Sequence, residues 1–142
     1  MRYYLDTNIL VFVILGQDDN ISDDVRALLS DYGNSFLTSI ICIQEVVHLV
    51  QIGKIEMPKG TDTRMAAMHA VNSIVELGVK IVPVSMKHIE CLANLPLYDD
   101  HRDPNDRLII AQAISDRIPL VSSDRKFARY GRYGLDFRYN ER

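Results

Sequence analysis

Cysteine is scarce in this sequence, which contains only Cys42 and Cys91. They form no CxxC pair, and no histidine and cysteine spacing typical of zinc is present, so neither a disulfide framework nor a structural zinc site is expected. Both cysteines lie in apolar helical patterns. Buried, free thiols in a reducing compartment are the usual state of such residues.

Long apolar segments are also missing. No run of about 18 apolar residues occurs, so no membrane span is expected. Asp6 interrupts the apolar start of the chain before the core of a signal peptide could form. The sequence therefore predicts a cytoplasmic protein.

Several motifs of common enzyme classes are absent. The 7 glycines are scattered near expected turns and helix ends, so there is no glycine-rich phosphate loop. No Ser/His/Asp arrangement can be identified, and Asp6-Thr7-Asn8 lacks the second acid that a haloacid-dehalogenase-type phosphatase needs. Repeats, low-complexity segments and linkers are missing too. The 142 residues suit one domain that spans residues 1–142.

Positive charge does not dominate, because the formal net charge is −3. This balance excludes a basic protein that coats nucleic acid. Charge is uneven, however, since residues 117–142 contain seven Lys or Arg residues against three acids. This segment is either a solvated surface or a surface that contacts a phosphate backbone.

Short apolar segments alternate with helical patterns along the chain. Helices are predicted from Ile9, from Ser22 to before Gly33, from Ser39 to Gly53, from Thr61 or Thr63 to Gly78, from Ser85 to Asn94, from Asp103 to Arg117, and briefly from Asp124. Strands are predicted at residues 2–5, 35–38, 79–84, 119–122 and 135–139, with a connector at 55–60 and a loop at 95–102. This alternation predicts an α/β fold with a mostly parallel sheet covered on both faces.

Four acidic residues each follow an apolar or structured segment. Asp6 and Asp124 are expected at the carboxyl ends of strands, Glu45 in the helix after a strand, and Asp106 at the start of a helix. Ligands bind beyond the carboxyl ends of the strands in such sheets. Because clustered carboxylates repel one another unless a cation neutralises them, this arrangement predicts a divalent-metal site.

Three of these acids also have structural explanations. Asp6 and Asp124 suit the N-cap of the helix that follows each, because Asp is a preferred N-cap residue. Glu45 could pair with His48 one turn further along its helix. Residues 45–48 also spell Glu-x-x-His, a motif of di-iron bundles, but the motif occurs once and this chain is not a four-helix bundle.

Asp106 has the strongest structural explanation, because an acid in the first turn of a helix stabilises the helix dipole. Asp103 and Pro104 form a strong helix start just before it. The residues alone leave open which of the two acids, Asp103 or Asp106, faces a metal. His101 lies close to Asp103 and is a candidate for a supporting role, whereas the other three histidines lie in patterns typical of packed or surface residues.

The predicted chemistry is metal-assisted hydrolysis. Oxygen ligands suit Mg²⁺ or Mn²⁺, bound as one or two ions. We expect Asp6, Asp106 and Asp124 to hold the metal, and Glu45 to bind a second ion or orient the attacking water. The candidate phosphate contacts are Arg107, Arg125 and Lys126, although surface solvation is the favoured explanation for any one of them taken alone.

The same segments resemble a known family, the PIN-domain ribonucleases that serve as VapC toxins in toxin–antitoxin pairs. The matching segments are residues 4–8, Thr38-Ser39 leading to Glu45-Val46, residues 120–124, and the specific stretch His-Arg-Asp-Pro-Asn-Asp-Arg-Leu-Ile-Ile-Ala-Gln-Ala at residues 101–113. They occur in family order over nearly the whole chain. The last stretch points to a subgroup with an HxDPxDRLxIAQA motif, although Asn105 stands where that subgroup commonly has Phe.

This resemblance implies more than the residue pattern does. The four acids match the acidic quartet of the family, Ser122 matches its Ser or Thr near the metal, and Asn8 matches a polar residue that supports the first acid. The family resemblance favours Asp106 as the metal ligand and Asp103 as the helix cap with a supporting role. A three-layer α/β/α fold, Mg²⁺ or Mn²⁺, an RNA substrate, homodimerisation and a small antitoxin partner are implied in the same way. Two alternatives stay open: a PIN-like nuclease or phosphoesterase that acts on DNA, and a non-catalytic PIN domain that binds RNA or a protein.

Overall fold

A parallel sheet organises the computed structural model, which describes residues 1–56 and 58–142. Its five strands lie in the order β3-β2-β1-β4-β5, and all neighbours run parallel. The strands are β1 (Arg2–Leu5), β2 (Ser35–Ser39), β3 (Lys80–Val82), β4 (Leu120–Ser122) and β5 (Phe137–Tyr139). The predicted α/β class with a parallel sheet is confirmed.

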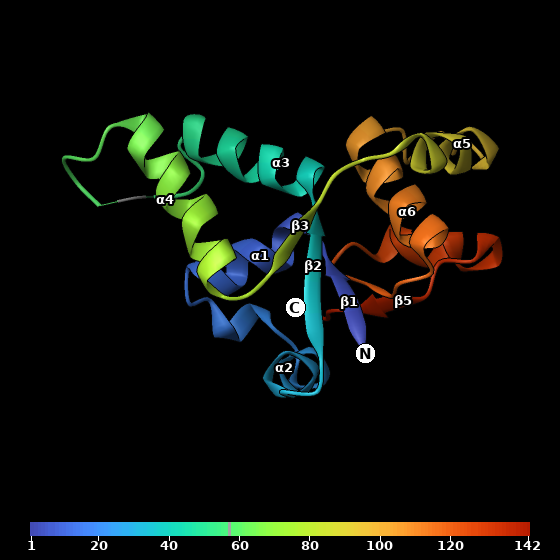
Figure 1. The fold of residues 1–142 in the computed structure, drawn as a ribbon, viewed down its shortest axis with the longest axis horizontal. Helices are drawn as coiled ribbons and strands as arrows, with labels where there is room; N and C mark the ends of the chain where they lie inside the picture. Colours follow the sequence, from blue (N-terminus) through green and yellow to red (C-terminus); the bar gives the residue numbers. More distant parts are fainter. Residues whose placement is uncertain (57) are drawn as a thin grey trace.

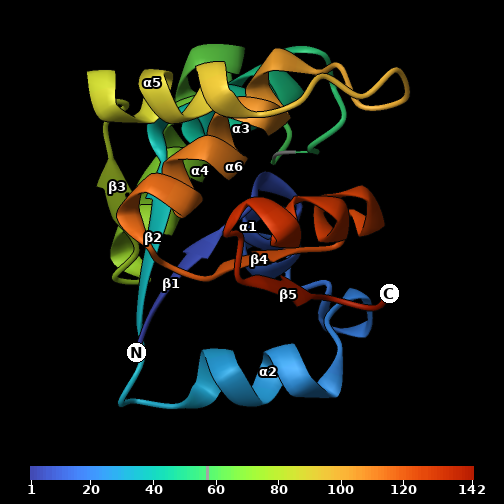
Figure 2. The ribbon, with the colours of Figure 1, turned by 90° about the vertical axis from the view of Figure 1, so that its right-hand side faces the viewer.

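Helices pack on both faces of this sheet. In Figure 1, α1, α3 and α4 lie on one side of the strands and α5 and α6 on the other, and Figure 2 shows α2 running beneath the sheet. The helices, with η for 3₁₀ helices, are α1 (Thr7–Ile14), η1 (Asp18–Asn20), α2 (Asp23–Ser30), α3 (Ile40–Gln51), α4 (Thr63–Glu76), α5 (Met86–Asn94), α6 (Pro104–Asp116) and η2 (Arg125–Tyr133). The result is the predicted three-layer α/β/α arrangement. Within the described residues, no helix combines the length and apolar character needed to cross a membrane.

The order of the strands places a crevice between β1 and β4. The chain moves outward from β1 through β2 to β3 and then returns to β4 on the other side of β1. Tyr4 and Leu5 of β1 pair with Leu120 and Val121 of β4. Ligands bind at such switch points, beyond the carboxyl ends of the strands.

Helix α6 is built as its sequence predicts. The side chain of Asp103 accepts a 2.8 Å hydrogen bond from the backbone N–H of Asn105, and Pro104 occupies the first turn. Ile109, Ile110 and other apolar residues of this helix are buried in the core. Burying this stripe fixes the helix, and with it the position of Asp106 in the first turn.

The structure corrects several predicted boundaries. Helix α1 begins at Thr7 instead of Ile9, because Asp6 caps it. Strand β3 stops at Val82, before Pro83, which has no N–H to donate to the sheet. The short helix expected from Asp124 is a 3₁₀ helix of 9 residues, and η1 was not predicted. The predicted connector at 55–60 lies partly outside the described residues.

Candidate active site

Asp6 lies at the point where β1 gives way to α1. Its Oδ1 accepts a 2.8 Å hydrogen bond from the backbone N–H of Thr7, and its Oδ2 accepts a 2.7 Å bond from the hydroxyl of Ser122. The side chain is buried, with 4% of its surface exposed. Asp6 is therefore a helix cap, as its structural explanation required, and it is also the acid nearest the centre of the crevice.

Ser122 connects β4 to this acid. Its hydroxyl donates to Asp6 and accepts hydrogen bonds from the backbone N–H of Asp124 at 3.1 Å and from Nδ2 of Asn8 at 3.3 Å. Nδ2 of Asn8 also lies 3.4 Å from Oδ2 of Asp6. Asn8, which the family resemblance placed in support of the first acid, and Ser122, which it placed near the metal, thus both contact Asp6.

Glu45 reaches the same place from α3. Its Oε1 accepts a 3.2 Å hydrogen bond from the hydroxyl of Thr7, and among the described residues no ion pair joins it to His48. Burial, followed by the charge of Asp6, raises the pKa of Glu45 to about 7. Glu45 therefore changes protonation state close to neutral pH.

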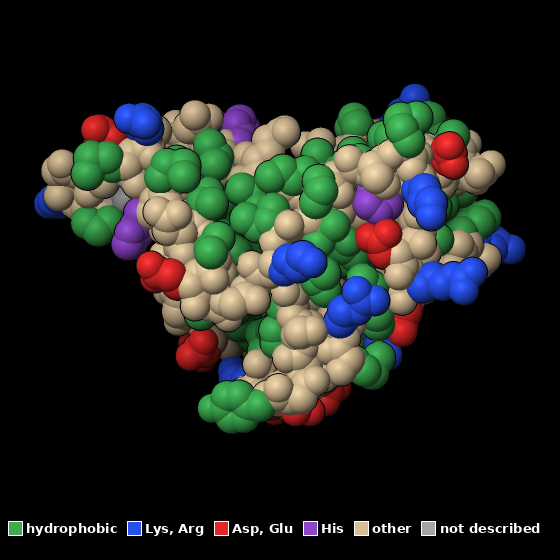
Figure 3. Space-filling model, in the orientation of Figure 1, with side chains coloured by type: hydrophobic (Ala, Val, Ile, Leu, Met, Phe, Trp, Pro, Cys, Tyr) green, Lys and Arg blue, Asp and Glu red, His purple; other side chains and the backbone are tan. Residues whose placement is uncertain are grey.

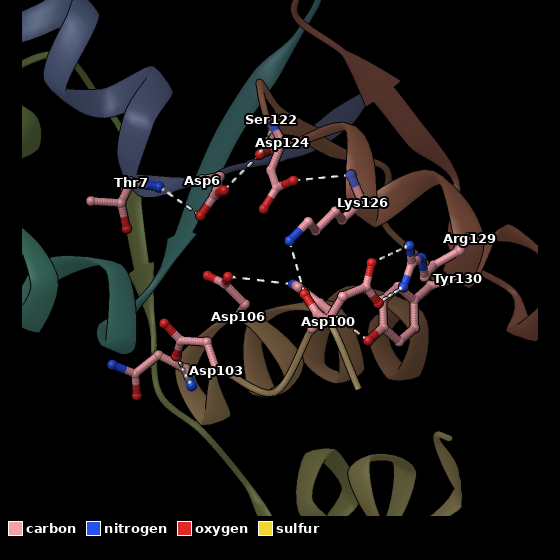
Figure 4. Close-up of polar contacts among 12 residues, drawn as sticks. Asp6, Thr7, Asp100, Asp103, Asp106, Ser122, Asp124, Lys126, Arg129 and Tyr130 are labelled. Atoms are coloured by element: carbon pink, nitrogen blue, oxygen red, sulfur yellow. Dashed lines mark hydrogen bonds and ion pairs between the residues drawn. The ribbon is translucent and has the colours of Figure 1, made fainter. Parts of the chain in front are cut away.

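Asp106 lies across the crevice from Asp6. Burial, together with the charges of Asp6, Asp103, Glu45 and Asp124, raises its pKa to about 8. Burial likewise raises the pKa of Asp6, against the hydrogen bonds from Ser122 and Thr7. Figure 4 shows the carboxylates of Asp6, Asp106 and Asp124 pointing toward a common space.

These acids share one groove of about 320 Å³. Its lining residues are Asp6, Thr7, Asn8, Val11, Phe12, Glu45, Leu49, Asp106, Asp124 and Arg142. A larger hollow of about 480 Å³ beside α4 is lined by Met65, Met68 and other residues without an acidic group. Of these two hollows, only the smaller one is lined by acidic side chains.

Asp124 and Asp103 both cap helices. Asp124 accepts a 2.9 Å hydrogen bond from the N–H of Lys126 at the start of η2, and its carboxylate still lines the groove. Asp103 caps α6 and is exposed, and it adds negative charge near Asp6, Glu45 and Asp106. The capping role predicted for Asp103 is thus observed, whereas the role of Asp106 as a metal ligand stays a prediction.

His101 is closer to the acids than its sequence position indicated. Its Nδ1 lies 2.7 Å from the hydroxyl of Tyr130, and its Nε2 lies 3.4 Å from Oδ2 of Asp106. One ligand atom from each of His101, Asp106 and Asp124 lies within 4.8 Å of the other two. Burial lowers the pKa of His101, which favours the neutral imidazole.

The basic residues predicted as phosphate contacts have other partners in the structure. Nη2 of Arg107 donates to the carbonyls of Leu95 and Pro96 at 3.3 and 3.2 Å, which holds the loop before α6. Nε of Arg125 donates to the hydroxyl of Tyr139 at 2.9 Å, and Nζ of Lys126 donates to the carbonyl of Asp100 at 2.8 Å. Arg125 and Lys126 are nevertheless exposed, so both stay accessible to a ligand.

Arg142 is a groove residue that the sequence did not single out. It lines the acidic groove, and its guanidinium carbon lies 5.5 Å from the centre of the Phe12 ring. Its only signal in the sequence was membership of the basic excess in residues 117–142.

The sequence matches a known protein family. The sequence model of the PIN domain matches residues 3–133. The chain belongs to the PIN domain family. Among curated proteins, none matches the sequence of this PIN domain.

Solved structures share the fold of this PIN domain. A chain of VapBC2 from Rickettsia felis, bound to a DNA fragment from the promoter, aligns with a TM-score of 0.68 at 21% identity, covering 99% of this chain and 100% of that one. VapBC-1 from nontypeable Haemophilus influenzae gives a TM-score of 0.67 at 17% identity over 98% of both chains. DNA-bound VapBC from Salmonella typhimurium gives a TM-score of 0.68 at 15% identity, and the alignment also covers 98% of both chains. The predicted PIN fold is thus confirmed.

Proposed function

We propose that this PIN domain is a metal-dependent endoribonuclease and the toxin of a toxin–antitoxin pair. The observation that carries the proposal is the convergence of Asp6, Glu45, Asp106 and Asp124 on one groove, where burial and mutual repulsion raise the pKa of Asp106 to about 8. Such a cluster is unfavourable without a cation, so a divalent ion is the natural counter-charge.

The groove offers ligands that suit Mg²⁺ or Mn²⁺. Asp6, Asp106 and Asp124 are proposed to hold the ion directly or through water, and Glu45 to hold a second ion or orient the attacking water. When bound, the metal would lower the pKa of a water molecule and offset the charge that develops on the phosphate. The number of ions is one or two.

Side chains around the proposed metal ligands hold Asp6 in place and can act on the attacking water. Ser122 and Thr7 fix both oxygens of Asp6, so this carboxylate keeps one orientation. The pKa of Glu45 is about 7 in the metal-free protein, and a bound cation would lower it, so that the ionised carboxylate could orient the attacking water or accept its proton. Asn8 holds Ser122 and Asp6 together.

RNA is the proposed substrate. The groove is open to solvent and is lined by the exposed cation Arg142, and the exposed Arg125 and Lys126 directly follow Asp124 in the chain, which suits a single-stranded or looped backbone. The choice of RNA over DNA rests on the resemblance to VapC ribonucleases. The first alternative is a PIN-like nuclease or phosphoesterase that acts on DNA. The second alternative is a non-catalytic PIN domain that binds RNA or a protein.

A small antitoxin and a second copy of the chain are the proposed protein partners. The solved structures with this fold include VapBC toxin–antitoxin complexes. Along α3, a hollow of about 430 Å³ is lined by Ile40, Ile41, Ile43 and Val47 among others, and Figure 3 shows hydrophobic side chains gathered across the middle of one face. Exposed apolar surface of this kind favours protein contacts.

The deciding experiment compares cleavage of structured RNAs with cleavage of the matching DNAs, with Mg²⁺, with Mn²⁺ and with a chelator. We expect metal-dependent cleavage of RNA that Asp6→Asn reduces at least about 100-fold while the circular-dichroism spectrum is kept. Asp24→Asn, an exposed acid on α2, is the matched control and should cleave normally. Cleavage by Asp6→Asn at the wild-type rate would contradict the mechanism, and cleavage of DNA alone would favour the alternative.

A further inference from the structure

His101 has a ring nitrogen with no hydrogen-bond partner inside the protein. The residue is buried, with 4% of its surface exposed. Its Nε2 is shielded from solvent and has no hydrogen-bond partner in the described part of the chain. Buried polar atoms are normally satisfied, so an exception of this kind calls for a specific explanation.

Nε2 lies close to two of the acids that line the groove. Oδ2 of Asp106 is 3.4 Å away, close enough for an ion pair but without the geometry of a hydrogen bond. One ligand atom from each of His101, Asp106 and Asp124 lies within 4.8 Å of the others. Two ligand atoms on one ion, each about 2.0–2.2 Å from it, are separated by roughly 3–4 Å. The 3.4 Å between Nε2 of His101 and Oδ2 of Asp106 lies in that range.

The other ring nitrogen fixes the orientation of the imidazole. Nδ1 lies 2.7 Å from the hydroxyl of Tyr130, which is fully buried. The rings of Phe127 and Tyr130 pack edge-on against the imidazole, with centroids 5.7 and 5.4 Å away. In the tautomer that carries its proton on Nδ1, His101 donates to the hydroxyl of Tyr130 and presents the Nε2 lone pair, which is the usual arrangement around metal-bound histidine.

We propose that Nε2 of His101 is a protein ligand of the divalent ion, together with Asp106 and Asp124, and that this nitrogen makes the site select Mn²⁺ or Co²⁺ over Mg²⁺. Imidazole suits transition ions, whereas Mg²⁺ favours oxygen ligands. This inference rests on the proposed function of the groove. Tyr130 is then a positioning residue that acts through His101.

The test is electron spin echo spectroscopy of bound Mn²⁺, which detects nitrogen directly coordinated to the ion. We expect nitrogen modulation in the wild-type protein, and a change in its pattern when histidine is labelled with ¹⁵N. His101→Gln should abolish the modulation, weaken Mn²⁺ binding about 10–100-fold and change Mg²⁺ binding less than about threefold. His88→Gln, which alters the other buried histidine, should keep the modulation.

A second variant covers the case in which His101→Gln fails to fold. The chain has 4 histidines, so replacing His48, His69 and His88 together by Gln leaves His101 as the only source of histidine nitrogen, and the modulation should persist. If Mn²⁺ binds but shows no nitrogen modulation, the inference that His101 is a metal ligand is overturned. If the same sample still cleaves RNA in a metal-dependent way, the proposed function stands. If the wild-type protein binds neither Mn²⁺ nor Mg²⁺ and does not cleave RNA, both are overturned.

Discussion

The hydroxyl of Ser122, at the end of β4, donates a 2.7 Å hydrogen bond to Oδ2 of Asp6, just after the neighbouring strand β1. The hydroxyl oxygen of Ser122 in turn accepts hydrogen bonds from the backbone N–H of Asp124 and from Nδ2 of Asn8. One fully buried serine therefore fixes the relative position of two acids that lie more than 100 residues apart in the sequence.

Ser122→Ala removes this connection. The carboxylate of Asp6 loses a donor and two buried donors lose their acceptor, so we expect a loss of about 1–3 kcal/mol in the free energy of unfolding. RNA cleavage should fall by roughly 10–100-fold, because residues that orient metal ligands typically contribute that much. Chemical denaturation and single-turnover cleavage measure the two effects. The control is Ser73→Ala on α4, which removes only a hydrogen bond to the His69 carbonyl and should change neither stability nor the cleavage rate. An unchanged cleavage rate in Ser122→Ala would show that Asp6 does not depend on its hydrogen bond from Ser122.

Asp106→Asn should separate stability from activity. Asp106 is surrounded by four other acids that raise its pKa, so removing its charge relieves repulsion in the metal-free protein. We expect the metal-free variant to gain about 1–2 kcal/mol of stability at pH 8 and to lose at least about 100-fold in cleavage. Thermal melting without metal and a cleavage assay with Mn²⁺ give the two values. A destabilised metal-free variant would mean that Asp106 makes favourable contacts in the absence of metal.

Local sequence signals were sufficient for the main elements. Asp103-Pro104 marked the start of α6 because capping is decided by adjacent residues, and the apolar strand segments could be found from their composition. The meeting of Asp6 with Asp124 was also predictable, because residues at the carboxyl ends of neighbouring parallel strands come together. The structural and functional explanations offered for Asp6, Asp103 and Asp124 were not exclusive, since all three cap helices while facing or flanking the groove.

The remaining features depend on long-range packing. Nothing near His101 in the sequence shows that Tyr130, 29 positions later, would orient its ring. The contact of Arg142 with the groove depends likewise on Phe12. Arg107 follows Asp106 directly, yet the helix turns its side chain to the loop carbonyls of Leu95 and Pro96. Side-chain direction on a helix changes by about 100° per residue, so adjacency in sequence did not imply a shared partner.

The stability of the metal-free protein should fall as the pH rises. Burial raises the pKa of Asp106 to about 8 and that of Glu45 to about 7, and it raises the pKa of Asp6. A folded-state pKa above the unfolded value means that the folded protein holds the proton more tightly. This contribution to stability is therefore fully present below about pH 4 and is lost as the pH rises through about 7 to 8.

Thermal melting in a chelator measures this effect. We expect Tm to fall by roughly 4–8 °C between pH 5.5 and pH 8.5. Adding Mn²⁺ at pH 8.5 should restore Tm, because the ion binds the folded protein with its carboxylates ionised. The double variant Asp106→Asn with Glu45→Gln is the control and should show a flatter profile. A wild-type Tm that rises steadily over this range would contradict the assigned direction of the pKa values.

Arg142→Ala should weaken substrate binding more than chemistry. Its guanidinium lines the groove beside the acids and rests on the ring of Phe12, where it can meet a backbone phosphate that is not being cleaved. We expect KM for RNA to rise about 3–10-fold with kcat within about twofold of wild type, which is the pattern of lost uniform binding. The salt dependence of binding should also become shallower, by about 0.7 in the slope of log K against log salt for one lost phosphate contact on a single strand. Arg64→Ala, an exposed arginine on α4, should alter neither quantity, and faster cleavage by Arg142→Ala would instead mean that this side chain obstructs the groove.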